Sequence, residues 1–306
     1  MIPDCDRAVP SLVPVPASVG SGDTTRAATT AATTETERAS GQVLETSTRR
    51  GHLARPKRKQ RRLKILALDL ETSPNLAYVW GLWNQNIAIS QMEASTEVIC
   101  FGARWYGQRG VTVKSVHHDG KQVMLQTAWD LLNEADAVMG WNSKGFDSKH
   151  LMREFLEAGM PPPAPYKDLD LMLAVKARFR FPSNKLDYVS QKLGVGKKVQ
   201  HEGFEMWRKC LAGDDEAWAR MIKYQKQDVN LLIDLYEKLR PWIPNHPSVA
   251  VIDGEPDGCP ACGSTHVQPR GLAHTNTGSY RRYVCLDCGK WSRGFKREQG
   301  SLLRAI

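Results

Sequence analysis

The apolar run Ile65–Leu70 constrains the fold more than any other part of the chain. All of its residues except Asp69 are apolar, and they do not alternate with polar residues as in a half-exposed strand. A short continuous apolar run is typical of a strand that is buried on both faces. Such a strand requires packed layers on both sides, which helices provide in α/β proteins. We therefore predict a sheet covered by helices that begins near Lys64.

The residues that follow predict the rest of this α/β layer. Short apolar segments predict strands, whereas apolar residues spaced three and four apart predict helices. Gly107–Gly110 predicts a hairpin connection between a strand that ends at Tyr106 and a strand that begins at Val111. The order of the elements predicts a mixed sheet flanked by helices. The predicted elements are strands Thr96–Tyr106 and Val111–His117, helix Met124–Glu134, strand Ala137–Trp141, and helices Ser148–Ala158, Leu186–Leu193 and Trp218–Leu239.

Composition divides the chain into three parts. Residues 1 to about 48 are rich in Thr, Ala, Ser, Pro and Gly and lack sustained hydrophobic periodicity, and with the basic residues that follow they predict a disordered basic tail over residues 1–62. Nine basic residues and no acid lie between Arg49 and Lys64; this run either contacts phosphate non-specifically or is a solvated linker. Proline, aspartate and glycine interrupt the chain after the predicted α/β domain, residues 63–242. A separate module is predicted at residues 255–298.

Charge is distributed unevenly between these parts. The formal net charge is +9, and residues 1–64 carry twelve Lys or Arg against six Asp or Glu. Residues 250–306 carry eight against five, so the remaining part is neutral. A neutral core with basic ends favours a polyanion such as nucleic acid as the partner, although basic ends can also serve solubility alone.

Hydropathy and cysteine usage bear on the compartment. No run of about 18 apolar residues occurs and no signal peptide is recognisable at the N-terminus, so we expect no membrane partner. Four of the seven cysteines form two C-x-x-C pairs. This usage favours a metal site in a reducing, cytoplasmic compartment, as in a bacterial or phage-infected cell, over a disulfide framework.

The first candidate site residues are Asp69 and Glu71, at the end of the predicted strand Ile65–Leu70. Residues two apart on a strand point to the same side of the sheet. Two carboxylates directed at one point repel each other unless a cation lies between them, and hard oxygen ligands suit Mg²⁺ or Mn²⁺. Taken alone, the pair is also compatible with ordinary loop acids.

A second acid, Asp147, follows the predicted strand Ala137–Trp141 after a short loop. Asn142 and Ser143 are favourable residues for the start of a helix. Asp147 is then expected in or near the first turn, where it can project over the carboxyl end of the strand. An acid at this place also interacts favourably with the helix dipole, which is the purely structural alternative.

The third signal is Tyr224 and Asp228, four residues apart on the predicted helix Trp218–Leu239. This spacing places both side chains on one helical face. The same face continues with Leu231, Leu232 and Leu235, which are expected to pack on the sheet. A carboxylate on a buried helix face is unfavourable unless it is paired or bound to a metal, so Asp228 is a candidate metal ligand.

Together these segments resemble a known superfamily. Asp69-Leu70-Glu71-Thr72, Asn142-x3-Phe146-Asp147 and Tyr224-x3-Asp228 resemble, in this order, the three exonuclease motifs of the DEDD superfamily. That superfamily includes DnaQ-like enzymes and the proofreading domains of family A and family B DNA polymerases, on a ribonuclease H-like fold. Tyrosine in the third motif resembles the DEDDy branch. The resemblance covers roughly residues 63–240.

The resemblance implies a 3′–5′ exonuclease that acts on DNA with two Mg²⁺ or Mn²⁺ ions, as a stand-alone proofreading or DNA-processing nuclease. It implies that Asp69 bridges the ions, Glu71 and Asp228 complete the nucleophile-side site, and Asp147 holds the second ion. Tyr224 would orient the attacking water. Two ions about 4 Å apart can stabilise the charge that builds on the attacking and leaving oxygens. A DNA polymerase or replication protein is the implied protein partner.

Three other functions remain open. The first is an RNA 3′-exonuclease of the same fold, and the second is a catalytically inactive nucleic-acid-binding protein. The third is a ribonuclease H-like endonuclease, which would not require Tyr224 and Asp228 at this spacing. Nucleic-acid contacts are predicted for Asn142, Lys144, Lys185 and Trp80, with Lys197, Lys198, Tyr78 and Trp83 as further candidates, although a solvated or core-covering role suits each of them as well.

The C-terminal module contains the pattern C-x2-C-x22-C-x2-C, formed by Cys259, Cys262, Cys285 and Cys288. Four thiolates in two such pairs are typical of one structural Zn²⁺, and glycines after each pair permit tight turns. The module resembles a zinc ribbon. Its basic residues between Arg270 and Arg297 alternate with tyrosine and tryptophan. This pattern predicts a nucleic-acid surface, with a protein-docking or structural role as the alternative.

Overall fold

The computed structural model describes residues 62–303. The predicted disordered tail and most of the basic run before Lys64 lie outside the described residues. Among the residues that are described, no helix is both long and apolar enough to cross a membrane.

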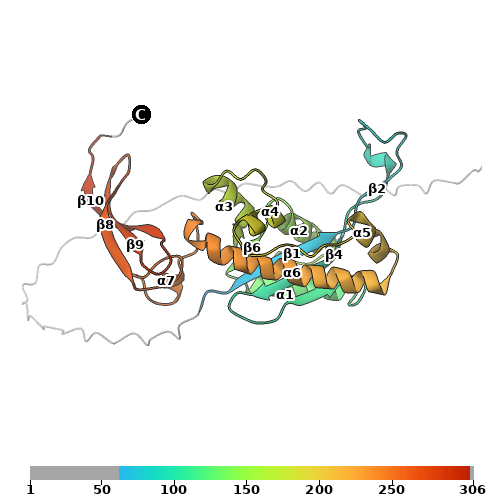
Figure 1. Ribbon diagram of the computed structural model, residues 1–306, viewed down its shortest axis with the longest axis horizontal. Helices are drawn as coiled ribbons and strands as arrows, with labels where there is room; N and C mark the ends of the chain where they lie inside the picture. The colour runs from blue at the N-terminus through green and yellow to red at the C-terminus, as the bar shows by residue number, and fades with distance from the viewer. Residues whose placement is uncertain (1–61, 304–306) are drawn as a thin grey trace, which may run out of the picture. The chain divides into compact units, whose positions relative to one another are not determined.

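The centre of the structure is a five-stranded mixed sheet with strand order β5-β4-β1-β6-β7 (Figure 1). β1 pairs antiparallel with β4 and parallel with β6, and β6 pairs parallel with β7. The prediction of a mixed sheet flanked by helices is therefore confirmed. The strands are β1 (Ile65–Thr72), β4 (Val98–Trp105), β5 (Thr112–Ser115), β6 (Ala137–Gly140) and β7 (Lys167–Asp170).

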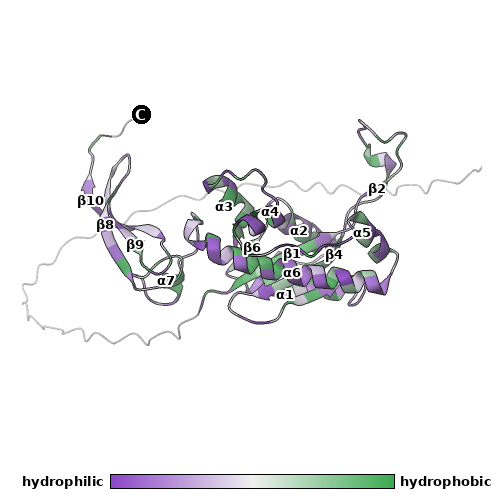
Figure 2. Cartoon of the chain, viewed as in Figure 1, coloured by the Kyte–Doolittle hydropathy of each residue, from purple (hydrophilic) through white to green (hydrophobic). Residues whose placement is uncertain are grey.

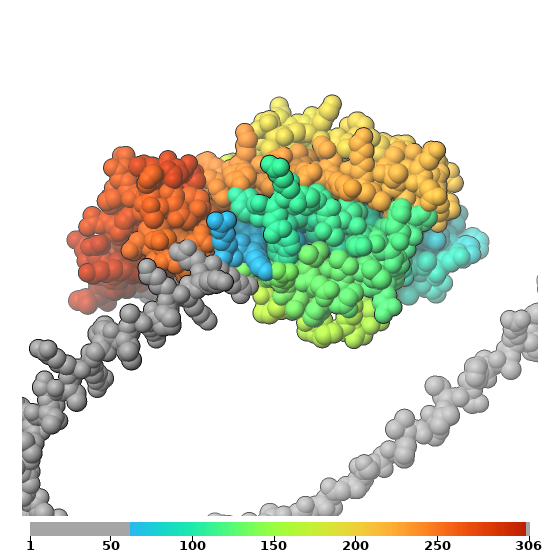
Figure 3. Space-filling model, turned by 90° about the horizontal axis from the view of Figure 1, so that it is seen from below, coloured from blue at the N-terminus to red at the C-terminus, as the bar shows by residue number. Residues whose placement is uncertain are grey.

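Strand β1 is buried on both faces, as its sequence predicts. Ile65 and Ala67 belong to one hydrophobic core, whereas Leu66, Leu68 and Leu70 belong to another on the opposite face. The first core is shared with helices α3, α4 and α6, and the second with α1 and α2. In Figure 3, the orange residues of α6 lie above the green residues that include α1. These helices are α1 (Lys121–Glu134), α2 (Asp147–Glu157), α3 (Leu171–Arg178), α4 (Leu186–Lys192) and α6 (Asp215–Leu239).

Helix α6 is the main packing partner of the sheet and the element that positions the site. Asp214 caps its start by accepting a hydrogen bond from the backbone N–H of Ala217 at 2.8 Å. The helix lies so close to β4 that a Cβ at Gly102 would be 3.0 Å from Val229. Gln225 Nε2 also donates to the backbone oxygen of Asp69 at 3.1 Å, which ties α6 to the end of β1.

Several elements differ from the sequence-based expectation. Helix α2 begins at Asp147 with Phe146 as its N-terminal cap residue, so Asp147 lies in the first turn as predicted, whereas the favourable helix-start residues Asn142 and Ser143 precede the helix. Asn142 instead has a φ of 65° and forms a tight turn before the helix. Strand β7, helix α3 and helix α5 (Phe204–Leu211) were not predicted, because β7 carries two acids in four residues and both helices are short.

Between β1 and β4 the chain forms an arm. Its elements are the short strands β2 (Leu76–Ala77) and β3 (Met92–Ala94) and the 3₁₀ helix η1 (Ile89–Gln91). The arm carries Tyr78, Trp80 and Trp83, all of which are exposed.

The C-terminal module is a three-stranded antiparallel sheet of order β10-β9-β8. Its hydrophobic core contains only three buried residues, Cys259, Ala261 and Cys285. Its strands are largely hydrophilic, in contrast to the central sheet (Figure 2). The elements are β8 (Val267–His274), β9 (Gly278–Cys285) and β10 (Trp291–Gly300), preceded by the 3₁₀ helix η2 (Arg240–Trp242) and helix α7 (Val249–Ile252).

Candidate active site

Three acids from two elements meet at the end of β1. One carboxylate oxygen each of Asp69 and Glu71, on β1, and of Asp228, on α6, lie within 4.8 Å of one another. The fourth acid, Asp147, accepts a hydrogen bond from the backbone N–H of Leu70 at 3.2 Å. Asp147 therefore lies against β1 at the residue between Asp69 and Glu71. The four acids that the sequence singled out, which we call the acid cluster, are brought together.

Each acid is held by backbone structure rather than by a flexible loop. Asp69 and Glu71 share a side of β1, where they pair with Gly102 and Cys100 of β4. Asp147 is the first residue of α2, and its side chain is buried. Asp228 lies on the face of α6 that packs on the sheet, and its side chain is fully buried. The cluster is thus fixed by the same core that forms the fold.

Burial raises the pKa values of all four acids, and repulsion between neighbouring carboxylates contributes. Burial raises the pKa of Asp69 well above its usual range, and the charges of Asp147, Glu71 and Asp228 raise it further. Burial raises the pKa of Glu71 to about 8 and the pKa of Asp147 to about 7. Burial also raises the pKa of Asp228, although Lys198 opposes this shift. In the absence of cations, the cluster therefore favours protonated carboxyls.

Two buried oxygens in the cluster lack hydrogen-bond partners among the described residues. They are Asp69 Oδ2 and Asp228 Oδ1. Buried polar atoms are usually paired, and an unpaired buried carboxylate oxygen is costly. The candidate ligands in the acid cluster are all carboxylate oxygens, the type of ligand that Mg²⁺ and Mn²⁺ prefer. The residues present therefore fit a divalent cation.

Tyr224 lies beside Asp228, and Lys198 contacts both. Lys198 Nζ donates to the Tyr224 hydroxyl at 2.7 Å and to Asp228 Oδ2 at 2.5 Å. Although burial lowers the pKa of Lys198, Asp228 and Tyr224 raise it overall, so the side chain remains a cation. Burial, followed by the charge of Asp228, raises the pKa of Tyr224. Lys198 was among the lysines considered for nucleic-acid contact, but its position here is part of the site.

Sequence reasoning missed two aromatic residues next to the acids. A hydrogen bond from the Trp207 side chain lowers the pKa of Glu71, against the larger effect of burial. The ring of His201 lies 5.0 Å from that of Tyr224 and 5.2 Å from that of Trp207, measured between centroids. A cavity of about 380 Å³ is lined by His201 and Trp207 together with Thr72, Ser73, Pro74, Gly203 and Phe204. Nothing in the sequence links helix α5 to Glu71, because the contact is made only in the fold.

A second acid pair organises the loop before Asp147. Asp168 Oδ1 and Oδ2 accept hydrogen bonds from Ser143 at 2.7 Å and from Ser148 at 2.8 Å. Asp170 accepts from the backbone N–H groups of Asn142 and Lys144, each at 3.2 Å. β7 thus holds the turn that leads into α2 and thereby positions Asp147.

The four residues predicted to contact nucleic acid differ in their location. Asn142 and Lys144 lie in the turn just before Asp147, and the Lys144 side chain is exposed. Trp80 is 99% exposed on the arm and is outside the acid cluster. Lys185 precedes helix α4 and lines a separate surface cavity with Asp187 and Tyr188.

The four cysteines of the C-terminal module form a second cluster of metal-ligand type, which we call the thiolate cluster. Their sulfur atoms lie within 4.8 Å of one another, with 3.6 Å between Cys259 and Cys288 and 3.7 Å between Cys262 and Cys285. These distances exclude disulfides. They suit a tetrahedral Zn²⁺, whose ligands at about 2.3 Å are about 3.8 Å apart. Gly263 and Gly289, after each pair, have φ values of 78° and 75°.

Comparison with known proteins supports the fold. Residues 89–240 match the RNase_H_2 family, described as RNase_H superfamily. The match contains Asp147, Tyr224 and Asp228 but begins after Glu71. The central domain is therefore ribonuclease H-like, and the match supports a nuclease of this superfamily. No curated protein matches the sequence.

One solved structure that the chain matches is the family B DNA polymerase from the hyperthermophilic archaeon Pyrobaculum calidifontis. The sequence identity is 18% and the TM-score is 0.45. The match covers 62% of this chain and 26% of the polymerase, so the chain spans about a quarter of that protein's length.

Proposed function

We propose that the chain is a metal-dependent 3′–5′ exonuclease of the DEDDy type that hydrolyses phosphodiester bonds of DNA. The carrying observation is the acid cluster, in which carboxylates from β1, α2 and α6 converge and leave two buried oxygens without partners among the described residues. The proposed catalytic domain is residues 63–242, and residues 255–298 form a zinc-ribbon module.

The acid cluster would hold two Mg²⁺ or Mn²⁺ ions. Asp69 would serve both ions, Glu71 and Asp228 would complete one site, and Asp147 would hold the other. When bound, such ions stabilise the negative charge that develops on the attacking and leaving oxygens of the phosphodiester. The four thiolates of the C-terminal module would hold one structural Zn²⁺; they belong to Cys259, Cys262, Cys285 and Cys288.

Tyr224 is suited to position the attacking water rather than to remove its proton. Because burial and Asp228 raise its pKa, the phenol stays protonated near neutral pH. A protonated hydroxyl donates one hydrogen bond and accepts others. Lys198 fixes the direction of this hydroxyl, since its ammonium also donates to Asp228 Oδ2. The pair Lys198 and Tyr224 therefore orders the side of the cluster at which a nucleophile would enter.

The substrate strand is proposed to approach through the residues around the cluster. Asn142 and Lys144 lie in the turn before Asp147, where an amide and an exposed ammonium can contact phosphate. Trp80 and Lys185 are proposed as more distant contacts. The choice of DNA over RNA rests on the resemblance of the three motifs to proofreading domains, and a DNA polymerase or replication protein is the proposed partner. A reducing, cytoplasmic compartment is proposed on the cysteine usage.

The deciding experiment follows end-labelled substrates. Purified protein is incubated with single- and double-stranded DNA and RNA, labelled at the 5′ end, with Mg²⁺, Mn²⁺ or no added divalent ion. A ladder that shortens from the 3′ end of DNA only with divalent ions supports the proposal. Faster shortening of RNA would assign the function to an RNA exonuclease, and internal cuts would assign it to an endonuclease.

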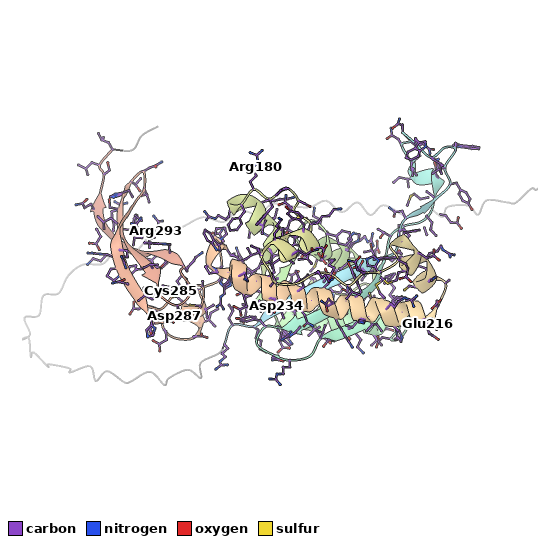
Figure 4. All side chains as sticks on the ribbon, in the orientation of Figure 1. Arg180, Glu216, Asp234, Cys285, Asp287 and Arg293 are labelled. Carbon is purple, nitrogen blue, oxygen red and sulfur yellow. The ribbon has the colours of Figure 1, made fainter. Side chains whose placement is uncertain are left out.

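A matched pair of variants ties the activity to the cluster. Asp228→Asn removes the charge of a fully buried acid, whereas Asp234→Asn removes the same charge from an exposed position on the same helix (Figure 4). We expect the first variant to be inactive and the second to match the wild type. Equal activity of both variants would exclude the acid cluster as the catalytic site.

A further inference from the structure

One face of the C-terminal sheet combines arginines with aromatic rings. Arg282 of β9 pairs with Arg293 of β10, and Tyr280 pairs with Arg297. Directly paired residues of antiparallel strands point to the same face. Trp291 lies two residues before Arg293 and therefore shares this face as well. We call Tyr280, Arg282, Trp291, Arg293 and Arg297 the Arg-aromatic face.

The arginines of this face lie over its rings. The guanidinium of Arg282 lies 4.7 Å from the ring centroid of Trp291, and that of Arg293 lies 4.5 Å from that of Tyr280. Arg293 projects from β10 in Figure 4. Among the described residues, none of the three arginines has a carboxylate within ion-pair distance. The face therefore carries three positive charges that the described part of the module does not neutralise.

The opposite face of the sheet has different properties. Arg281 and Glu298 form an ion pair there, with Arg281 Nε 3.5 Å from Glu298 Oε1. Cys285, on the same side of β9 as Arg281, belongs to the thiolate cluster. The charges of Arg281 and Glu298 therefore balance each other on this face. The three arginines without a carboxylate partner lie on the Arg-aromatic face instead.

We propose that the Arg-aromatic face is a binding site for single-stranded nucleic acid, separate from the acid cluster. Guanidinium groups without a carboxylate partner bind backbone phosphates, while tyrosine and tryptophan rings stack on bases, and this combination is typical of single-strand binding surfaces. Arg282 uses its Nε to donate to the backbone oxygen of Arg270 at 2.9 Å, and its terminal nitrogens remain for a phosphate. Stacking requires exposed base faces, which a duplex does not offer. Trp291 is 51% exposed and is therefore accessible to a base. The site would retain a strand on the protein independently of hydrolysis.

The test measures binding without turnover. The full chain is titrated against fluorescein-labelled oligodeoxythymidine, without added divalent ion and without chelator, so that structural zinc is retained. The variant R282Q/R293Q/R297Q is expected to bind at least about tenfold more weakly, because three phosphate contacts are lost. On a single strand, each phosphate contact contributes about 0.7 to the slope of log affinity against log salt concentration. Loss of three contacts should therefore reduce the magnitude of this slope by about 2. The control R281Q, on the opposite face, should keep both the affinity and the slope.

A second variant separates stacking from charge. Tyr280→Leu with Trp291→Leu should weaken binding while leaving the salt slope unchanged, because it removes ring faces and no charge. Zinc content of one per chain and an unchanged circular dichroism spectrum confirm that each variant is folded. An oligouridine titration then determines whether the site distinguishes RNA from DNA.

Two results would overturn the proposal. One is a folded R282Q/R293Q/R297Q variant with wild-type affinity and salt slope, which would leave the face to a protein partner. The other is an equal loss in R281Q, which would show a general charge effect. The outcome is independent of the proposed exonuclease, since binding is measured without hydrolysis. A chain that binds but does not degrade DNA would contradict the nuclease proposal and leave this one intact.

Discussion

The acid cluster and the thiolate cluster are both sets of metal-ligand side chains, but the fold builds them in opposite ways. The acids project from β1, α2 and α6, whose apolar residues form cores on both faces of a five-stranded sheet. The cysteines belong to a module whose core consists of Cys259, Ala261 and Cys285. In the first case the core positions the ligands, and in the second the ligands are most of the core.

This difference separates catalysis from stability. A rigid scaffold can hold buried like charges in place, at a cost in folding free energy that its large core offsets. A module with a small core has no such reserve, so its metal supplies most of its folding free energy. We therefore expect removal of the acids to abolish activity without unfolding the chain, and removal of the thiolates to unfold the module without abolishing catalysis.

The largest expected effect follows from Asp69→Asn. Loss of the ligand shared by both proposed ions should lower kcat by at least about 1,000-fold. Thermal unfolding of the metal-free variant should occur at the wild-type temperature or above it, because a neutral amide replaces a carboxyl group whose ionised form is disfavoured by burial and by the neighbouring acids. Steady-state hydrolysis and calorimetry measure the two quantities. A strongly destabilised variant would contradict the view that the core alone positions the cluster.

The converse change is Cys285→Ser. We expect zinc content below one per chain and protease cleavage between Cys259 and Cys288, since structural zinc contributes on the order of 10 kcal/mol to such modules. Hydrolysis of a short single strand should stay within about twofold of the wild type, because the acid cluster belongs to a different core. The conservative control is Ser301→Ala, outside the cluster. Loss of hydrolysis together with zinc would show that the two regions fold as one unit.

A smaller effect is expected for Tyr224→Phe. This variant removes the hydroxyl that Lys198 orients but leaves the ring in its contacts with His201 and Trp207. We expect kcat to fall by about 10- to 100-fold with little change in KM, as for loss of one positioned hydrogen bond in a transition state. Tyr188→Phe, on helix α4, is the matched control. A change in KM alone would instead indicate a role for Tyr224 in substrate binding.

The sequence predicted the frame of the fold and the residues of the two clusters, but not their surroundings. β1 was predictable because its residues are apolar on both faces, and α6 because its apolar spacing extends over many turns. β7 was not, because Lys167-Asp168-Leu169-Asp170 resembles a loop until its acids are seen to hold Ser143, Ser148 and the turn before Asp147.

Contacts between distant segments were the other part that could not be predicted. Lys198 and Asp228 are thirty residues apart, and no local pattern indicates that Lys198 donates to both Asp228 and Tyr224. The same holds for Trp207 and Glu71. The boundaries 63–242 and 255–298 stay predictions, as do the roles of the site residues.

The smallest expected effect is on the pH dependence of stability, and it concerns the carboxyl groups of the acid cluster. Burial raises the pKa of Glu71 to about 8 and the pKa of Asp147 to about 7, whereas unfolded carboxyls titrate near about 4. Between these values the folded, metal-free chain binds more protons than the unfolded chain. Its stability should therefore be highest below about pH 4 as far as these groups are concerned, and should decrease as the pH rises to about 8.

Divalent ions require the ionised carboxylates, so their effect should have the opposite dependence. The increase in unfolding temperature on adding Mn²⁺ should be larger at about pH 8.5 than at about pH 6, because fewer protons must be displaced from Glu71 and Asp147. Glu71→Gln should reduce this difference, whereas Glu216→Gln, on an exposed position of α6, should not. An Mn²⁺ shift that is equal at both pH values would mean that the ions bind at a site whose ligands are already ionised at about pH 6, and not at the acid cluster.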